Sequence, residues 1–286
     1  DLTNELMRKA DVIVATGGSA MVKSAYSSGR PSYGVGPGNA QVIVDSSFED
    51  YPLMVAQIMT SRVYDNGMPC TGEQTLIIPE EKSDEIDNAF EEKGAYLVTE
   101  PADIQNLRKA IFPKGFEGPI NVDIVGHPAE EVARYANIRV PEGTKLLMVK
   151  LNKHAREEVL SREIMCPIVR CFTYKNFKDG VAIARANLLM EGAGHSSTIY
   201  SNIDDNIMYA GNQIPVGRLL VNQPNVNAAG SSFATGLVPT ISLGCGSWGN
   251  NSISENLSYK HLMNETRVSY IIKDAYAPSA DEIWAE

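Results

Sequence analysis

Short apolar runs alternate with longer segments of helical periodicity along most of this chain. The apolar runs are bounded by turn residues, a pattern typical of strands that are buried on both faces. They predict strands at 12–15, 41–44, 76–78 and 168–174, with two more near Tyr96 and Leu146. The intervening segments predict helices at 17–28, 52–64 and 83–93, and another that follows residue 174 and ends at Leu189. Such alternation predicts an α/β fold built on a parallel sheet.

Composition and charge narrow the class of protein. With 286 residues, 43% of them hydrophobic and 21% charged, the chain can bury a sizeable core in one large or two modest domains. The net charge of −10 argues against nucleic acid or an anionic membrane as a partner. No apolar run approaches the roughly 20 residues that span a bilayer, and no signal-peptide pattern opens the sequence. These features predict a cytoplasmic protein.

The four cysteines, at positions 70, 166, 171 and 245, lack the paired spacing of a zinc site. We therefore expect reduced thiols and no metal cofactor. Cys166 and Cys171 are expected to be packing residues. Cys70 is different, because it lies in the turn-rich stretch 64–74, between a helical segment and an apolar strand.

Two interpretations of Cys70 are open at this point. A free cysteine is usually a small buried apolar residue. A thiol on a loop can instead be a nucleophile. Here the turn at Asn66 and Gly67, followed by Pro69, leaves the Cys70 N–H free to face an oxyanion. A sulfur and a backbone donor in one residue suit acyl transfer or addition to an aldehyde.

Six segments in this order resemble the aldehyde dehydrogenase superfamily, and within it the branch that makes acyl-coenzyme A. They are 15–19 (ATGGS), 33–39 (YGVGPGN), 65–70 (DNGMPC), 163–167 (EIMCP), 191–195 (EGAGH) and 243–255 (LGCGSWGNNSISE). The resemblance spans most of the chain. It implies a remnant of a Rossmann-like nucleotide-binding domain and a three-layer α/β catalytic domain. It also implies Cys70 as nucleophile, NAD or NADP as cofactor, and coenzyme A as co-substrate.

A missing carboxylate distinguishes the acylating branch. In hydrolytic members of the family, a glutamate that activates water aligns with Gly34, and here no carboxylate occurs between Arg30 and Val44. Without that base, water attacks a thioester slowly, whereas the coenzyme A thiolate is a far better nucleophile. An acyl-CoA product is therefore expected.

The cofactor site is expected at residues 16–19, which follow a strand and open a helix. Free N–H groups in such a turn favour anionic phosphate, although an ordinary strand-to-helix turn has the same pattern. By the resemblance, Thr16, Gly17 and Gly18 contact the cofactor at its nicotinamide end. Glu163 alone would be read as a solvated glutamate, but the resemblance implies that its carboxylate accepts hydrogen bonds from ribose hydroxyls.

Small residues flank His195, which suggests an accessible side chain. A lone histidine is often structural. The resemblance implies proton exchange with the coenzyme A thiol or with the hemithioacetal hydroxyl, for which an ordinary pKa near ~6.5 is suitable. Further residues are expected to line the aldehyde pocket: Phe233 and Cys245, with Ser231 and Ser232 as additional candidates.

The resemblance implies a division of the chain into 1–36, the end of an NAD-binding domain, 37–245, the catalytic domain, and 246–286, a return segment with an oligomerisation strand. The stretch 265–272 is expected to be an exposed edge strand that pairs copies in a homo-oligomer, a dimer or larger. Complete relatives carry a long preceding segment, so this chain is expected to be a piece of a longer protein.

The expected reaction interconverts an aldehyde, CoA and NAD(P)+ with acyl-CoA and NAD(P)H, and the aldehyde is succinate semialdehyde or acetaldehyde. A succinyl substrate needs a cation for its free carboxylate, and Arg218 is a candidate. Two alternatives stay open. The chain could be a non-catalytic assembly or interaction module of such an enzyme, or a thiol acyltransferase that does not use NAD.

Overall fold

A seven-stranded parallel sheet forms the centre of the computed structural model, which describes residues 2–285. The strand order is β5-β6-β7-β4-β3-β8-β9, and every neighbouring pair is parallel. The strands are β3 (Ala40–Val44), β4 (Glu73–Pro79), β5 (Ala95–Val98), β6 (Leu146–Lys150), β7 (Ile168–Tyr174), β8 (Gly194–Tyr200) and β9 (Val216–Val221). The predicted α/β class is confirmed.

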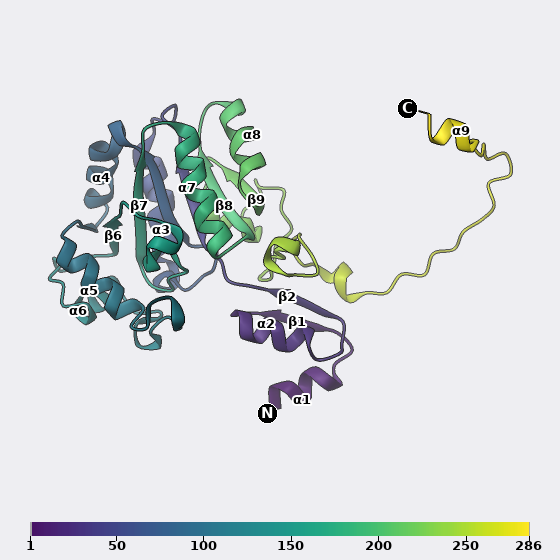
Figure 1. Ribbon diagram of the computed structural model, residues 1–286, viewed down its shortest axis with the longest axis horizontal. Helices are drawn as coiled ribbons and strands as arrows, with labels where there is room; N and C mark the ends of the chain where they lie inside the picture. Colours follow the sequence, from purple (N-terminus) through teal and green to yellow (C-terminus); the bar gives the residue numbers. More distant parts are fainter. Residues whose placement is uncertain (1, 286) are drawn as a thin grey trace.

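Helices cover both faces of this sheet, which gives the body three layers (Figure 1). One face carries α3 (Tyr51–Val63) and α4 (Ser83–Glu92). The other carries α5 (Pro101–Ile111), α6 (Ala129–Tyr135), α7 (Phe177–Met190) and α8 (Asp204–Gln213). Successive side chains of a strand point to opposite faces, so Leu76 and Ile78 of β4 contact the first layer and Ile77 the second. Burial of both faces explains why the strands read as continuous apolar runs.

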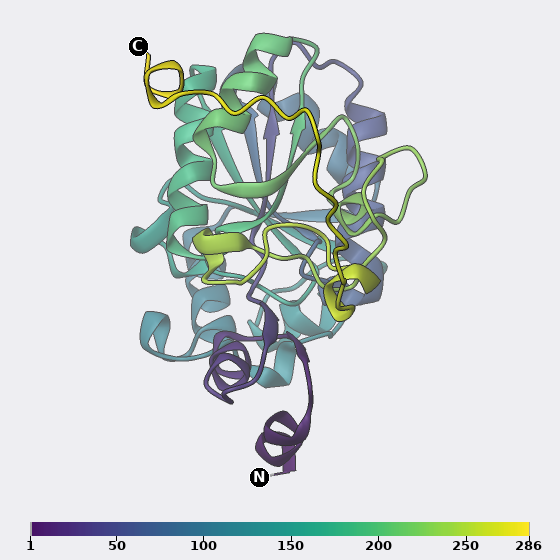
Figure 2. The same ribbon diagram turned by 90° about the vertical axis from the view of Figure 1, so that its right-hand side faces the viewer.

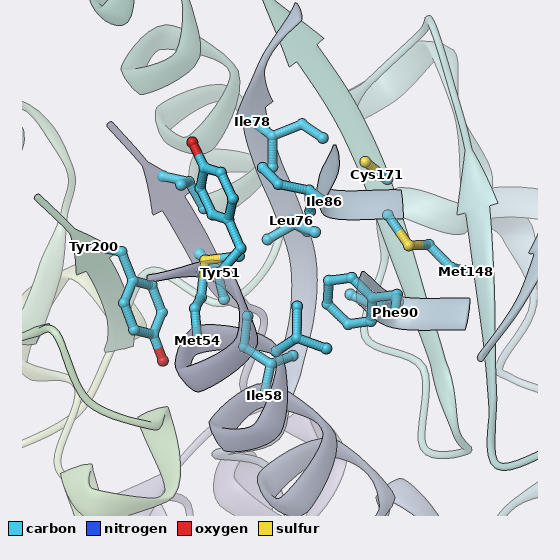
Figure 3. Close-up of a cluster of buried hydrophobic side chains, with 14 of the residues drawn as sticks. Tyr51, Met54, Ile58, Leu76, Ile78, Ile86, Phe90, Met148, Cys171 and Tyr200 are labelled. Carbon is cyan, nitrogen blue, oxygen red and sulfur yellow. The ribbon is translucent and has the colours of Figure 1, made fainter. Parts of the chain in front are cut away.

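The core between α3 and the sheet shows how the sequence sets this layer. Asp50 caps α3 by accepting a hydrogen bond from the Leu53 N–H, and a proline occupies the first turn, so the helix begins there. Its buried side chains then pack against β4 and α4 (Figure 3). Tyr51, Met54 and Ile58 of α3 share this cluster with Leu76 and Ile78 of β4 and Phe90 of α4.

The predicted elements agree unevenly with the structure. The strand at 168–174 is β7, and the helices at 52–64 and 83–93 match α3 and α4 to within a residue at each end. The helix at 17–28 is shorter, because α2 (Ser19–Tyr26) begins only after Gly18, whose backbone is extended. The pattern missed α5, α6, α8, β8 and β9.

A second, two-stranded sheet precedes the large one. In it, β1 (Ile13–Thr16) pairs in parallel with β2 (Ser32–Val35), and α2 packs against both strands. The chain before them forms α1 (Leu2–Lys9), and residues 36–39 lead from β2 into β3. Figures 1 and 2 show this small sheet below the large one.

The end of the chain leaves the body. Residues 263–279 have no helix or strand and lead to α9 (Ala280–Ile283), well away from the sheet in Figure 1. The edge strand expected at 265–272 is therefore absent from the single chain, since a strand needs a neighbour with which to pair. Its side chains are exposed as expected, with Ile271 at 91%. None of the helices within residues 2–285 is long and apolar enough to cross a membrane.

Candidate active site

Loops that precede neighbouring strands meet at one edge of the large sheet. All strands of a parallel sheet start at the same edge. Cys70 lies just before β4, and His195 lies at the start of β8, with β3 between these strands. The segments 36–39 and 162–167 precede β3 and β7. This amino-terminal edge therefore collects four of the six segments that resemble aldehyde dehydrogenases.

The site centres on a cysteine–histidine pair. The Sγ atom of Cys70 lies 3.2 Å from Nε2 of His195, although the residues are 125 positions apart in the chain. The other ring nitrogen, Nδ1, lies 2.9 Å from the hydroxyl of Ser196. A thiol and an imidazole at this distance are the groups that a covalent mechanism with a cysteine nucleophile requires.

A strained turn presents Cys70. Asp65 and Asn66 have left-handed backbone angles, with φ of 47° and 50°, and the Asn66 amide donates to the Gly126 carbonyl at 2.8 Å. A bond from the Gly72 N–H to the Pro69 carbonyl closes the turn. Between residues 2 and 285, no oxygen accepts a hydrogen bond from the Cys70 N–H. That donor is available for a developing oxyanion.

His195 is fully buried, so the expectation of an accessible side chain was wrong. The small residues around it serve close packing. Gly194 has φ of +87°, and a Cβ atom there would lie 1.9 Å from the Cys245 carbonyl oxygen. Glycine thus lets the segment 243–246 lie directly on the start of β8, which excludes water from the imidazole.

Burial keeps both members of the pair neutral. It raises the pKa of Cys70 to about 12, with Glu163 and then Cys245 adding to the effect, and the Cys70 backbone N–H and then Arg218 opposing it. It lowers the pKa of His195 to about 3, and the positive charge of Arg218 acts in the same direction. Loss of hydration disfavours each charged form. At pH 7 the resting pair is a thiol beside a neutral imidazole.

Glu163 is joined to the nucleophile through one glycine. Its Oε1 atom accepts a hydrogen bond of 2.9 Å from the Gly38 N–H. A Cβ atom at Gly38 would lie 2.2 Å from the Cys70 carbonyl oxygen, so only glycine allows this loop to pack there. Burial raises the pKa of Glu163 to about 7, the bond from Gly38 opposes that rise, and Glu191 adds to it.

A cleft of about 610 Å³ opens beside these residues. Gly18, at the start of α2, lines it together with Glu163, Cys245 and Trp248. No side chain caps the first turn of α2, and a Cβ atom at Gly18 would meet nothing within 4 Å. Cys70 is not among the lining residues. No group of three His, Cys, Asp or Glu side chains that could hold a metal occurs among residues 2–285.

Several expected site residues lie elsewhere. The Thr16 hydroxyl is 2.8 Å from the Ser242 hydroxyl, and the Gly17 N–H donates to the Val35 carbonyl. Thr16 therefore ties the small sheet to residue 242, and the bond from Gly17 continues the pairing of β1 with β2; neither residue lines the cleft. Phe233 is fully exposed and absent from the cleft, so its assignment to a pocket was wrong. The sequence alone does not show whether an aromatic residue in a loop lines a pocket or lies exposed on the surface.

Arg218 is also not free to bind a substrate carboxylate. Its guanidinium donates to the carbonyls of His195, Gly244 and Ser254 and to the Asn256 side chain. It therefore joins the start of β8 to the segment 243–256. The proposal that it holds a succinyl group is not supported by this geometry.

Two fully buried arginines support the site and were not predicted. Arg62 donates to the carbonyls of Ile164, Cys166 and Ile168 at 2.7 to 2.8 Å. Arg170 donates to the Asn39 side chain at 2.7 Å and to the Arg162 carbonyl at 2.8 Å. Burial lowers the pKa of Arg62 to about 10 and that of Arg170 to about 9. Together they fix the segment that carries Glu163.

The comparison with known proteins agrees with this arrangement. No family model matches the chain. It is 48% identical over 284 residues to a protein named succinate-semialdehyde dehydrogenase (acetylating) from Clostridium kluyveri, covering 99% of this chain and 62% of that protein. The chain is a homologue of acylating aldehyde dehydrogenases. The resemblance predicted from the six segments is confirmed.

Two further acylating or related aldehyde dehydrogenases extend the match. The bifunctional aldehyde-alcohol dehydrogenase of Escherichia coli is 36% identical over 275 residues, which cover 94% of this chain and 30% of that protein. The crystal structure of an acetylating aldehyde dehydrogenase from Geobacillus thermoglucosidasius superposes with a TM-score of 0.88 at 33% identity, covering 96% of this chain and 60% of that one. The chain thus spans less than two thirds of the length of these aldehyde dehydrogenases.

Proposed function

We propose that this chain carries the catalytic part of a CoA-acylating aldehyde dehydrogenase. The reaction would interconvert an aldehyde, CoA and NAD(P)+ with acyl-CoA and NAD(P)H through a thioester on Cys70. The observation that carries the proposal is the contact of 3.2 Å between Cys70 Sγ and His195 Nε2, beside a Cys70 N–H that donates to no oxygen of residues 2–285. The 48% identity to an acetylating succinate-semialdehyde dehydrogenase supports it.

The residues of this chain account for the covalent steps. The Cys70 sulfur adds to the aldehyde carbon, and the Cys70 N–H donates to the oxygen that becomes an alkoxide. The thioester that follows oxidation is attacked by the thiolate of CoA, whose proton has gone to solvent, and Cys70 leaves as a thiolate beside the His195 imidazole. Burial of His195 excludes water from this side of the thioester.

The cofactor site fits a nicotinamide dinucleotide. The uncapped N–H groups at the start of α2 suit a phosphate, and the carboxylate of Glu163 in the same cleft suits ribose hydroxyls. NAD(P)+ supplies a hydride acceptor when it is bound. Gly18 and Glu163 are the residues of this chain that would hold it.

The lack of a carboxylate in the segment that leads into β3 supports CoA over water as the acyl acceptor. No carboxylate occurs between Arg30 and Val44. At Gly34 itself a Cβ atom would lie 2.6 Å from Val22 Cγ1 and 2.9 Å from the Tyr26 ring, so that position faces α2. Without an activated water, the thioester persists until a thiolate reaches it.

We also propose that copies of this chain associate. The side chains of Val268, Tyr270 and Ile271 are at least 74% exposed on a segment without helix or strand. Contiguous exposed apolar side chains commonly mark an interaction surface. Pairing of this segment with a second copy would cover them. The substrate would be a small aldehyde, with succinate semialdehyde and acetaldehyde as the candidates.

The test of the reaction is Cys70→Ala in the enzyme that carries this chain, with Cys171→Ala as the matched control because Cys171 is buried away from the site. We expect Cys70→Ala to lower NAD(P)H formation from aldehyde and CoA by about a thousandfold or more, in the range seen for loss of a nucleophile. Intact mass after incubation with acyl-CoA should show one acyl group in the parent enzyme and in Cys171→Ala only. Normal turnover or an acyl adduct in Cys70→Ala would contradict the assignment.

A further inference from the structure

A buried chain of polar side chains continues behind His195. Its Nδ1 atom lies 2.9 Å from the Ser196 hydroxyl, and that hydroxyl lies 3.0 Å from the Asn225 side-chain nitrogen. The Asn225 backbone N–H donates to Oε1 of Glu73 at 2.8 Å. All four residues have 0% exposure, so water cannot replace any of these partners. The hydrogen atoms in the chain can therefore be assigned by counting donors and acceptors.

The orientation of the Asn225 amide is fixed by a backbone oxygen. The side-chain nitrogen of Asn225 lies 2.8 Å from the Thr71 carbonyl oxygen, which can only accept. If the amide were reversed, the Asn225 side-chain oxygen would face the Thr71 carbonyl oxygen, and neither atom can donate. The Asn225 NH2 group therefore faces Thr71, and its second hydrogen is donated to the Ser196 hydroxyl oxygen. The Asn225 oxygen accepts from the Thr198 hydroxyl on the other side.

The Ser196 hydroxyl then has one hydrogen left to donate. Among residues 2–285, its only partners within hydrogen-bonding distance are Asn225, which donates to it, and His195 Nδ1. If Nδ1 also donated, the serine would accept twice and its own buried O–H would have no acceptor. A buried unsatisfied donor is costly. Donation from Ser196 to Nδ1 satisfies both the serine hydroxyl and the ring nitrogen.

We propose that Ser196 and Asn225 are positioning residues that hold His195 in the tautomer with its proton on Nε2. The Nε2–H then points at Cys70 Sγ, 3.2 Å away. In this state the imidazole donates to the sulfur and stabilises a thiolate, both when Cys70 attacks and when it leaves. It does not take the proton of the Cys70 thiol, which passes to solvent before the attack, since Cys70 is only partly buried. The role of this tautomer in catalysis rests on the proposed function. The tautomer itself follows from the hydrogen bonds of the chain and needs no substrate.

Other charged groups act on the same two atoms. Glu163 and Cys245 raise the pKa of Cys70, and Arg218 lowers it. Arg218 and burial keep His195 neutral, with a pKa of about 3. A neutral imidazole carries a single proton, so its location decides whether the ring can donate to the sulfur. Removal of Ser196 alters that location without changing any charge.

The test compares Ser196→Ala with Ser197→Ala. Ser197 is the next residue of β8, is equally buried, and accepts from the Gln41 N–H instead of contacting His195. The rate of Cys70 alkylation by iodoacetamide is measured against pH by peptide mass. A hydrogen bond to an ionised sulfur is lost, so we expect Ser196→Ala to react about tenfold more slowly than the parent at pH 8. Ser197→Ala should match the parent.

Nitrogen NMR of the histidine side chains gives a direct second measurement. The chain has four histidines, and His195→Gln assigns the signal. We expect a neutral ring protonated on Nε2 in the parent and a mixture of tautomers in Ser196→Ala. A parent ring protonated on Nδ1, or equal alkylation profiles for the two serine variants, would overturn the proposal. Neither measurement uses aldehyde, CoA or NAD(P), so failure of the proposed reaction would be seen separately in the Cys70→Ala assay.

Discussion

Replacement of Glu163 by glutamine separates two roles of one carboxylate. Glu163→Gln keeps the size of the side chain and an oxygen that can accept from the Gly38 N–H. It removes a negative charge that, after burial, is the largest cause of the raised pKa of Cys70. The variant should therefore have a more acidic thiol. It should also bind the ribose of a cofactor less well, since a neutral amide is a weaker acceptor than a carboxylate.

The size of the effect depends on pH in a characteristic way. A like charge nearby shifts a pKa by roughly one unit or more, which corresponds to about 1.4 kcal/mol and a tenfold change in thiolate. The pKa of Glu163 is itself about 7. Below that pH the parent carboxyl is protonated and has no charge to remove. We expect the variant to be alkylated about tenfold faster at pH 8.5 and at a nearly equal rate at pH 5.5.

The ratio of the alkylation rates of Glu163→Gln and the parent is measured by iodoacetamide labelling of Cys70 between pH 5.5 and 9.5, with peptide mass as the readout. Glu157→Gln is the control, because the Glu157 side chain is 74% exposed and pairs only with Lys153. Its profile should match the parent. A rate ratio for Glu163→Gln that stays constant over the whole range, or a variant that reacts more slowly than the parent at pH 8.5, would refute the electrostatic reasoning.

Two predictions concern the surfaces of the chain. Ile271→Asp, at a side chain that is 91% exposed, should shift the mass in solution from a dimer or larger assembly toward a single chain, while Lys273→Asp should not; light scattering after size exclusion measures this, and an unchanged assembly in Ile271→Asp would contradict it. Residues 1–286 alone should bind NAD+ with a Kd above roughly 1 mM in a calorimetric titration, since a two-stranded sheet such as β1–β2 is marginally stable and Val14 on it is 43% exposed. Micromolar binding of NAD+ would contradict this prediction of weak binding.

The sequence predicts the apolar part of this fold well and its polar part poorly. β7 and α3 could be found because their buried faces are apolar, so periodicity and burial agree. β8 was missed because its buried residues include a histidine, two serines and a threonine. These residues satisfy their polar groups through partners such as Asn225, which lie far away in the chain. A pattern based on hydrophobicity has no means of detecting such burial.

The candidate site shows the same limit. Cys70 could be found from its local turn, because asparagine, glycine and proline have strong backbone preferences. The burial of His195 depends on the segment 243–246, which packs on it from 48 or more positions away, and the sequence does not show this contact. Arg62 and Arg170 gave no signal either. Arg62 donates mostly to backbone carbonyls, which every residue type supplies, and Arg170 donates mostly to neutral side chains such as Asn39 and Thr75.

The arrangement of β4, β3 and β8 also affects when the reactive pair can form. Cys70 and His195 flank β3 and are 125 positions apart, so their contact closes one of the longest loops in the catalytic sheet. Non-local contacts of this kind form slowly, because loop closure costs entropy before any contact offsets it. A chain in which β8 has not joined the sheet has Cys70 without its histidine. The reactivity of this one sulfur therefore reports whether β8 has paired with β3.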